Sequence, residues 1–535
     1  MADYFESAGS RDPVAAAEQA LSDLTPQDLM ALPRKERPNW MVTRYPVSME
    51  EFERLNAEAN QPDARPLEAH YDAAHADVTA DTPLASALDL PEDQAAELTP
   101  AAAAPSTTAS FQGIPATGWR PSDTSIAVGQ NNVLLAVNTD LAGYSKAGAL
   151  QFRWNNMTAL FKNVLLALPG ASIFDPGIFY DHYANRYVVV VAARRQSPAG
   201  SWLLIGVSQT GNPGGTYWIW ALDARLDGSN PTNNWSDYPK VGFDTQAVYI
   251  ATNQFQIGGG FQYAKFRILN KSELYQGAAL HWYDFWNLKN PNGSGAFTVQ
   301  PASHFRGVGG NPPAYLVNGF FPSGNQLTLW ALANPVASWS GGTPSLSRQA
   351  VPCRAYDFPP NAQQLGSANP ISTNDPRLLN AVFQNAGGVQ RLWTCHTVKI
   401  SWQGDPQARC GIQWYEINVP TATVVQQNAY GASGKYYFFP AIQTDINRNA
   451  FFAFCRSGST EYVNVRQTGR RVGDPANTLQ GSALVKAGES AYPTDRWGDY
   501  TGICRDGADA ATCWGYAQYA ASGGNWGTWA FSMKF

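Results

Sequence analysis

A short phrase recurs seven times between Pro121 and Tyr500, and each copy has a small polar or acidic residue, often a proline, and then alternating apolar residues. Its copies begin at Ser122, Phe174, Ser236, Gly310, Asn374, Phe439 and Gly498. The step from one copy to the next is roughly 52 to 74 residues. A period of that length with several strands in each unit is typical of four-stranded propeller blades. The sequence therefore predicts an all-β fold, a seven-bladed β-propeller.

The composition agrees with a β-rich protein and excludes several function classes. Only 15% of the 535 residues are charged, while 13% are aromatic. The formal net charge is −5 and no basic block is present, which argues against nucleic-acid binding. No apolar stretch is long enough for a transmembrane helix, so we expect no membrane span.

The first 107 residues differ in kind from the rest. Helical spacing runs through 14–32 and again through 49–59, and 81–110 is rich in Ala, Pro, Thr and acidic residues. We expect two parts: a helical arm with an Ala/Pro-rich linker over 1–107, and the propeller over 108–535. The arm is either an assembly element that makes a homo-oligomer or a partly disordered extension.

The last unit offers only three strands before the chain stops. Residues 107–114, just before the first unit, could supply the fourth. Such an exchange would tie the two ends of the propeller together and remove an exposed sheet edge.

Several stretches resemble a broad group of secreted bacterial β-propeller proteins of uncharacterised function. The matching motifs are the Asp-Pro strand at Asp175, the Asp-Tyr-Pro-Lys motif at 237–240 and the Arg-Trp-Gly-Asp-Tyr motif at 496–500. The resemblance covers roughly 113–535 and implies an extracellular or cell-envelope location. It supplies no catalytic residues. The first residues show no signal peptide, which departs from the family pattern.

The repeated acidic position is the main candidate site. We expect its side chains to start the inner strands and to form a ring at one mouth of the channel. A ring of this kind could bind a ligand such as a sugar, or Ca²⁺ through Asp123, Asp175 and Asp375. The alternative is that each residue only caps a strand end. The expected ligand-binding members are Asp123, Asp175, Asp237, Asn311, Asp375 and Asp499.

A second candidate is the polar and aromatic cluster at 496–500. Arg496 could pair with a carboxylate and Trp497 could stack on a sugar, while Asp499, Tyr500 and Asp237 are candidate catalytic groups. A packing corner between blades explains the same residues without chemistry. Lyase chemistry would need a base such as His182, which lies in a predicted hairpin turn and is expected to be exposed.

Two further features bear on function. Trp282 and Trp286 precede a polar loop and are candidate sugar-binding rings. All six cysteines lie in the C-terminal third. Either Cys504 pairs with Cys513, and Cys395 with Cys410, as disulfides across hairpins, or all six are buried thiols.

These patterns predict a recognition or assembly protein outside the cell or in its envelope that binds polysaccharide or a protein partner. The alternative is a carbohydrate-active enzyme, a glycoside hydrolase or polysaccharide lyase, with its site at the acidic mouth. The sequence leaves open whether the protein is an enzyme.

Overall fold

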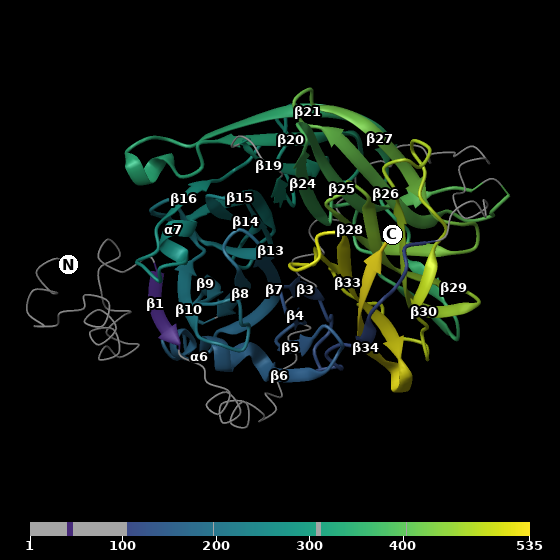
Figure 1. Cartoon of the computed structure of the whole chain (residues 1–535), viewed down its shortest axis with the longest axis horizontal. Coiled ribbons are helices and arrows are strands. Elements are labelled where there is room, and N and C mark those ends of the chain that lie inside the picture. Colours follow the sequence, from purple (N-terminus) through teal and green to yellow (C-terminus); the bar gives the residue numbers. More distant parts are fainter. Residues whose placement is uncertain (1–39, 46–103, 196, 307–311, 403) are drawn as a thin grey trace, which may run out of the picture.

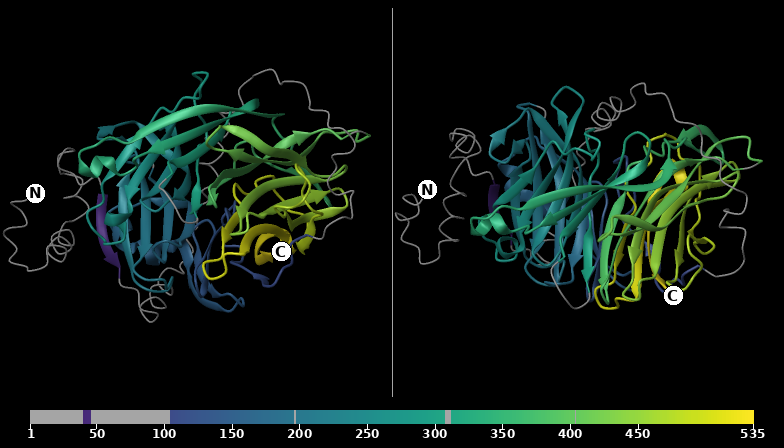
Figure 2. Two further views of the ribbon diagram at one scale, coloured as in Figure 1. Left: turned by 45° about the horizontal axis from the view of Figure 1, so that its top comes forward. Right: turned by 90° about the horizontal axis from the view of Figure 1, so that it is seen from above.

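The computed structural model describes residues 40–45, 104–195, 197–306, 312–402 and 404–535, and these residues are nearly all β-structure (Figure 1). Most strands form four-stranded antiparallel meanders that follow the chain. In the side views of Figure 2, the strands of the N-terminal half (blue to teal) stand beside those of the C-terminal half (green to yellow).

The meanders begin soon after residue 120. The first contains β3 (Ser125–Val128), β4 (Asn132–Ala136), β5 (Leu141–Ser145) and β6 (Leu150–Trp154). The second contains β7 (Ser172–Asp181), β8 (Arg186–Arg195), β9 (Gly200–Ser208) and β10 (Tyr217–Asp223). The third contains β13 (Asn234–Phe243), β14 (Ala247–Gln256), β15 (Phe261–Asn270) and β16 (Trp282–Phe285). The next contains β17 (Gln300–Pro301), β19 (Ala314–Gly319), β20 (Gly324–Ala333) and β21 (Ser345–Tyr356).

The same arrangement continues to the C-terminus. It comprises β24 (Asn380–Ala386), β25 (Val389–Ile400), β26 (Arg409–Asn418) and β27 (Thr423–Tyr430), then β28 (Tyr436–Thr444), β29 (Ala450–Gly458), β30 (Glu461–Arg470) and β31 (Ala483–Lys486). The last meander contains β32 (Gly502–Arg505), β33 (Thr512–Ala521), β34 (Asn525–Lys534) and β2 (Ser110–Gln112). Small two-stranded sheets pair β11 (Leu226–Asp227) with β12 (Asn230–Pro231), and β22 (Ala362–Gln364) with β23 (Ser367–Ile371).

The repeated phrase is a backbone irregularity at the start of every inner strand except β32. Six non-glycine residues there have a left-handed backbone with φ between 47° and 60°, and the pairing register shifts at this point in β7, β13 and β28. Asp and Asn tolerate this conformation, whereas Thr, Tyr and Phe adopt it only when the surroundings impose it. The six residues are Asp123, Asp175, Tyr238, Thr298, Asn374 and Phe439.

The fourth copy of the phrase was placed wrongly. The stretch predicted to be an inner strand contains β19, which is the second strand of its meander, because β17 precedes it and pairs with it. The residue in the repeated position is Thr298, and Asn311 lies outside the described residues. The β17 segment also runs very close to β13: a Cβ on Gly242 would lie 2.7 Å from the carbonyl oxygen of Ala302, so only glycine fits there.

One short strand joins two meanders. β18 (Ser303–Arg306) pairs in parallel with both β13 and β24, which makes one nine-stranded sheet. β18 therefore links the inner strand of the third meander directly to that of the fifth.

The predicted closing strand is confirmed. β2 pairs antiparallel with β34, with Phe111 opposite Ala530. Further main-chain hydrogen bonds link Ser106 to Lys534 in both directions and Gly113 to Thr528. This exchange joins residues more than 400 positions apart, and it covers the edge that β34 would otherwise expose.

Part of the N-terminal region belongs to a sheet. β1 (Trp40–Tyr45) pairs antiparallel with β10 and becomes the fifth strand of that sheet, at its outer edge (Figure 1). The segments 14–32 and 49–59, which were predicted to be helical, lie outside the described residues.

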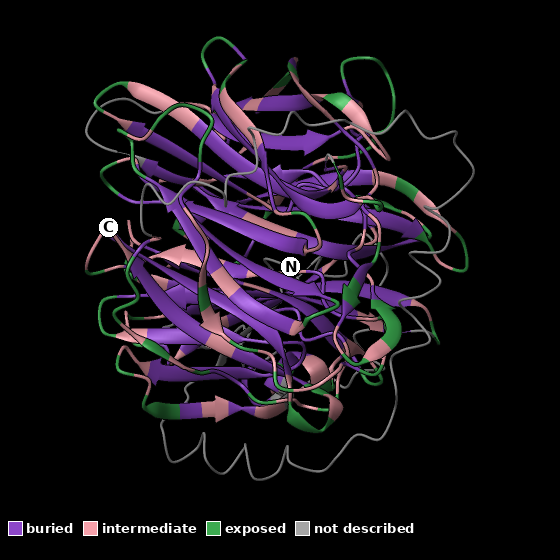
Figure 3. Cartoon of the chain, turned by 90° about the vertical axis from the view of Figure 1, so that its right-hand side faces the viewer, coloured by how far each residue is buried: buried purple, intermediate pink, exposed green. Residues whose placement is uncertain are grey.

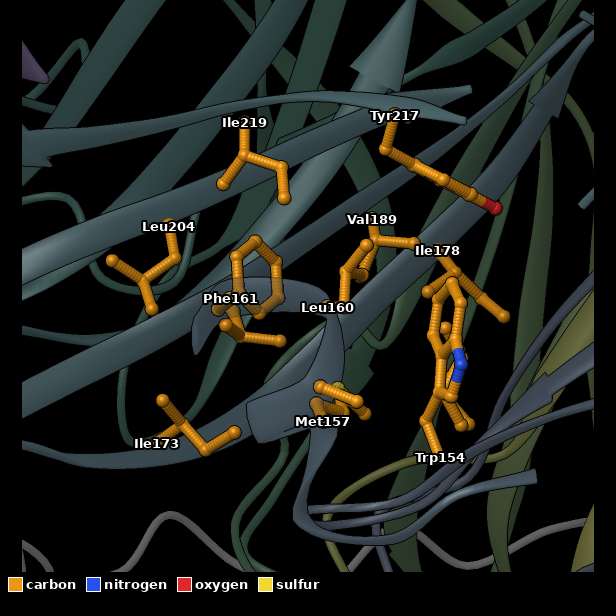
Figure 4. Packing of buried hydrophobic residues seen from close by; sticks show 14 of the residues in the cluster. Trp154, Met157, Leu160, Phe161, Ile173, Ile178, Val189, Leu204, Tyr217 and Ile219 are labelled. Carbon is orange, nitrogen blue, oxygen red and sulfur yellow. The ribbon is translucent and has the colours of Figure 1, made fainter. Parts of the chain in front are cut away.

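The core is made of apolar clusters between neighbouring sheets. Strand interiors are buried and exposure is concentrated in the connecting loops (Figure 3). Helix α6 (Thr158–Leu166) contributes to one cluster, in which Leu160 and Phe161 pack with Leu204 and Ile219 (Figure 4). The other helical segments that the structure describes are α7 (Lys271–Leu274), η3 (Asn155–Met157), η4 (Ala337–Ser340) and η5 (Ser522–Gly524).

The predicted disulfides are wrong, and the six cysteines are free thiols. The hairpin register explains this for the β32–β33 pair, because Cys504 stands opposite Trp514 while Cys513 stands opposite Arg505. Adjacent residues on a strand point to opposite faces, so the two thiols lie on opposite sides of the sheet. Cys395 and Cys410 are likewise in different core clusters.

Candidate functional site: the axial cavity and the acidic layer

The inner strands surround a cavity of about 450 Å³, which we call the axial cavity. Its walls come from β3, β7, β13, β17, β24, β28 and β32, so every meander contributes. The walls mix apolar side chains with hydroxyl and amide groups. The polar groups include Ser125, Gln300, Asn380, Gln443 and Thr501.

Four of the predicted acidic residues gather at one end of this cavity. Asp123, Asp175, Asp237 and Asp499 form what we call the acidic layer, and each is at most 3% exposed. Thr124, Pro176 and Tyr500, which follow three of them in the chain, line the cavity, whereas the four carboxyl groups do not. The acidic layer therefore closes this end of the cavity and is not an open mouth, which corrects the predicted arrangement.

Hydrogen bonds hold the acidic layer together. Asp123 accepts one hydrogen bond from the Asn138 amide at 2.6 Å and another from the main-chain N–H of Asp499 at 2.8 Å. Asp499 forms a two-pronged ion pair with Arg496, with both distances 2.8 Å. Asn374 donates a further hydrogen bond to Asp499 at 3.0 Å. The predicted partnership of Arg496 with a carboxylate is thus present in the structure, although the carboxylate is already fully occupied.

Burial and mutual repulsion perturb the acidic layer. Burial raises the pKa of Asp123 well above its usual range, and the charges of Asp499 and Asp175 raise it further. Burial likewise raises the pKa of Asp237, with Asp175 and Asp499 adding to the effect and Arg377 opposing it. This part of the structure therefore favours the protonated forms of Asp123 and Asp237 more than an exposed site would.

Two tyrosines and an arginine complete this end of the cavity. Tyr238 and Tyr500 have ring centroids 4.9 Å apart, and the Tyr238 hydroxyl donates to the main-chain oxygen of Asp499. The Arg377 guanidinium stacks 4.5 Å from the Tyr238 ring centroid and forms an ion pair with Asp375. Asp375 is therefore committed to Arg377 and does not join the acidic layer.

Lys240 lies where the acidic layer meets the cavity. Its Nζ is 3.3 Å from the Tyr500 ring centroid and 3.9 Å from that of Tyr238. The side chain is half-buried and lines the cavity beside Tyr500. Burial lowers the pKa of Lys240 to about 7, although Asp175, Asp499 and Asp123 favour its charged form.

Residues at the opposite ends of the inner strands also line the cavity. Ile446 is 58% exposed there, so the cavity reaches solvent on this side. Arg505 stacks 4.0 Å above the Phe305 ring. His182, predicted to be exposed, instead stacks on Phe305 with centroids 4.9 Å apart, and burial lowers its pKa to about 4.

The predicted aromatic candidates differ in their surroundings. Trp497 is 1% exposed and packs edge-on against Tyr492, with ring centroids 4.9 Å apart. It therefore has the structural packing role that was the alternative for this cluster, and its ring has no face available to a sugar. Trp282 is half-buried beneath the Arg267 guanidinium at 4.5 Å. Trp286 is 42% exposed and keeps an accessible ring, as expected.

The proposed calcium ligands do not fit a calcium site. In the part of the chain that the structure describes, no group of three or more His, Cys, Asp or Glu side chains is placed to hold a metal ion. Asp375 is neutralised by Arg377, and Asp123 accepts hydrogen bonds from Asn138 and a main-chain amide. Calcium needs six to eight oxygens that are free to coordinate it.

The sequence interpretation missed the roles of three residues in this site. Lys240 and Tyr238 belong to the Asp-Tyr-Pro-Lys motif, which was used only for the resemblance to secreted propellers. Lys240 lines the cavity, and the Tyr238 ring contacts its amine. Arg377 follows the fifth copy of the phrase. A basic residue two or three positions after the acidic one in two copies is the signal that could have indicated paired charges at the axis.

The comparisons with known proteins find solved structures of low similarity. No protein-family model and no curated protein matches it. Similar solved structures include a protein of unknown function from Dyadobacter fermentans and an alpha-L-arabinanase from Penicillium chrysogenum complexed with arabinobiose. Each has 8% identity and a TM-score of 0.36, over 80% of this chain and 99% of the other.

A mutant of Trypanosoma rangeli sialidase with trans-sialidase activity is also similar, with 9% identity and a TM-score of 0.34. The match covers 81% of this chain and 60% of the sialidase. Among the described residues, no helix is both long and apolar enough to cross a membrane.

Proposed function

We propose that the chain is a seven-bladed β-propeller that binds carbohydrate in its axial cavity. The observation that carries this proposal is the cavity itself, which all the inner strands surround. Its volume of about 450 Å³ is in the range of small-molecule sites, and its walls combine apolar surface with hydroxyl and amide groups. Sugars need this combination, because their C–H faces pack on apolar surface and their hydroxyl groups need hydrogen-bond partners.

Recognition fits the geometry better than catalysis at the acidic layer. The four carboxyl groups do not line the cavity, and Asp499 is held by Arg496 and Asn374. A ligand at the closed end of the cavity would contact Lys240 and Tyr500, which line it, and not the four carboxyl groups. The proposal includes an extracellular or cell-envelope location, because the sequence resembles secreted propellers. The proposed partner is the end of a polysaccharide chain.

A carbohydrate-active enzyme is the second candidate, and one observation favours it. Asp123 and Asp237 have raised pKa values beside Asp175 and Asp499. Glycoside hydrolysis uses such a pair, a protonated acid and an ionised partner. For this chemistry Lys240 and Tyr500 would have to move aside, so that the substrate could reach the carboxyl groups.

Calorimetric titration with a panel of glycans and methyl glycosides tests the binding proposal. The variant Ala381→Trp should fill the cavity, because Ala381 lines it and is 4% exposed. Val425→Trp is the matched control, because Val425 is 43% exposed and does not line the cavity. We expect Ala381→Trp to abolish glycan binding while Val425→Trp retains it, with both melting temperatures measured. Equal binding by the two variants would contradict a site in the axial cavity.

The enzyme alternative has its own test. Any glycan that binds is incubated with the protein and assayed for new reducing ends or for the unsaturated product of a lyase. Activity that is lost in Asp237→Asn, with a melting temperature at or above that of the wild type, would support the enzyme. Binding without turnover in the wild-type protein would leave recognition as the function.

A further inference from the structure

Half-buried Lys240 differs from the buried lysines Lys265 and Lys271 in having no hydrogen-bond partner among the described residues. Lys265, for example, donates to two main-chain oxygens at 2.8 Å and to Asp227 at 2.9 Å. Lys271 donates to the main-chain oxygen of Asp244 and pairs with Asp181. Lys240 Nζ instead rests against the rings of Tyr238 and Tyr500 and lines the axial cavity. Its donors and its lone pair are therefore available only to a molecule in the cavity.

The charges around Lys240 select the kind of molecule that it can meet. The groups that face it are Asp123, Asp175 and Asp499, together with Arg377 and the two tyrosines. An anionic ligand would be repelled by the three carboxyl groups, and a cationic one would compete with Lys240 and Arg377. A neutral polar ligand avoids both penalties.

The protonation state of Lys240 adds a chemical property to this position. Burial lowers the pKa of its amine to about 7, so a large fraction of the side chain is neutral near neutral pH. A neutral lysine amine is a nucleophile toward carbonyl carbon, whereas an ammonium group is not.

We propose that Lys240 is a nucleophilic amine that condenses with the carbonyl group of a small neutral aldehyde or ketone in the axial cavity, the open-chain form of a reducing sugar being the class that the walls fit. The identity of the ligand rests on the proposed carbohydrate-binding function. The nitrogen lone pair forms a bond to the carbonyl carbon, and the carbonyl oxygen becomes a hydroxyl group. The nitrogen then loses its proton, the hydroxyl group gains one and leaves as water, and a C=N bond remains. No oxidant or reductant is needed, and the bond is reversible.

Reductive trapping tests this proposal on the full chain. The protein is incubated at pH 7 with glycolaldehyde or with D-glucose in the presence of cyanoborohydride, and modified lysines are located by peptide mass spectrometry. We expect Lys240 to be modified faster than Lys265 by on the order of tenfold or more, because Lys265 is buried but fully hydrogen-bonded. The trapping rate at Lys240 should rise through about pH 7, whereas unfolding in guanidinium should remove the difference between the two lysines. Equal or slower modification of Lys240 in the folded protein would overturn the proposal.

Two substitutions separate reactivity from folding. Lys240→Arg keeps a positive charge at the site and Lys240→Met removes it, and neither can form an imine. Both should lack the trapped adduct at position 240, and at least one should keep the wild-type melting temperature. Total adduct formation in either variant that continues at the wild-type rate would refute the assignment to Lys240, which is the only lysine among the described residues that line the cavity.

A methyl glycoside distinguishes failure of this inference from failure of the proposed function, because it cannot open to an aldehyde. If the methyl glycoside binds but no aldehyde is trapped at Lys240, the binding proposal stands and the inference fails. If glycolaldehyde is trapped at Lys240 but no saccharide binds, the amine is reactive and the carbohydrate proposal fails. If neither occurs, both fail.

Discussion

Removal of the closing strand β2 should cost most of the net stability of the protein. Outside the β2–β34 ladder, four main-chain hydrogen bonds connect the segment 106–113 to β34, and Ile114 is completely buried. At about 0.5–1.5 kcal/mol for each hydrogen bond and about 2 kcal/mol for the isoleucine, the loss is about 4–8 kcal/mol. Folded domains are commonly stable by only about 5–15 kcal/mol, so this is a large part of the total.

Two truncated chains make the comparison. One begins at Ala104 and keeps β2, and the other begins at Thr117 and lacks it, so both lack β1. Thermal and urea unfolding are followed by circular dichroism and by tryptophan fluorescence. We expect the shorter chain to unfold at a much lower temperature or to aggregate because β34 presents an open edge. If both chains unfold at the same temperature and urea concentration, the reasoning about closure is refuted.

Three further predictions follow from single sites. Asp237→Asn should stabilise the protein at pH 7 to 8. The pKa of Asp237 is higher in the folded protein than in the unfolded chain, so the free energy of unfolding of the wild type falls as pH rises from the unfolded-state pKa to the folded-state pKa. The asparagine amide mimics the protonated carboxyl group and does not titrate. Urea unfolding from pH 4 to 8 should therefore show a flatter profile for this variant, and a steeper one would contradict the assignment. Thiol titration of the denatured, unreduced protein should find six free thiols, and four or fewer would indicate a disulfide. Trp497→Ala should lose about 3–5 kcal/mol in urea unfolding, while Trp286→Ala should change stability by less than about 0.5 kcal/mol, and equal losses would argue against the burial difference.

The sequence was most informative at positions where a particular backbone conformation favours a particular type of residue. Asp and Asn tolerate the left-handed conformation, so the repeat was visible at Asp123, Asp175 and Asn374. The repeat could not be recognised at Thr298, because threonine does not favour the left-handed conformation and adopts it only where tertiary contacts impose it. The next strand, β19, was then mistaken for the inner one.

The sequence predicted which acidic residues come together at the candidate site, but it did not predict that they are buried. Four of the expected acids do converge on one point, because the inner strands start at equivalent positions. Whether they face solvent depends on side chains that other strands bring in, such as Arg377, Tyr238 and Lys240. Tyr238 and Arg377 pack beside the acids and Lys240 lies between the acids and the cavity, and the contacts among these residues form only in the folded chain.

The period of the repeat and the alternation within each unit determined the β class, the approximate lengths of the units and the strand that closes the chain, because these follow from local backbone preference and from the need to cover a sheet edge. Only the tertiary structure decided which polar side chains are buried, which form hydrogen bonds or ion pairs, and which line the cavity. The pKa of Lys240, the partners of Asp499 and the separation of the cysteines all depend on neighbours that are distant in sequence, and electrostatic energy in a buried site is set by these neighbours.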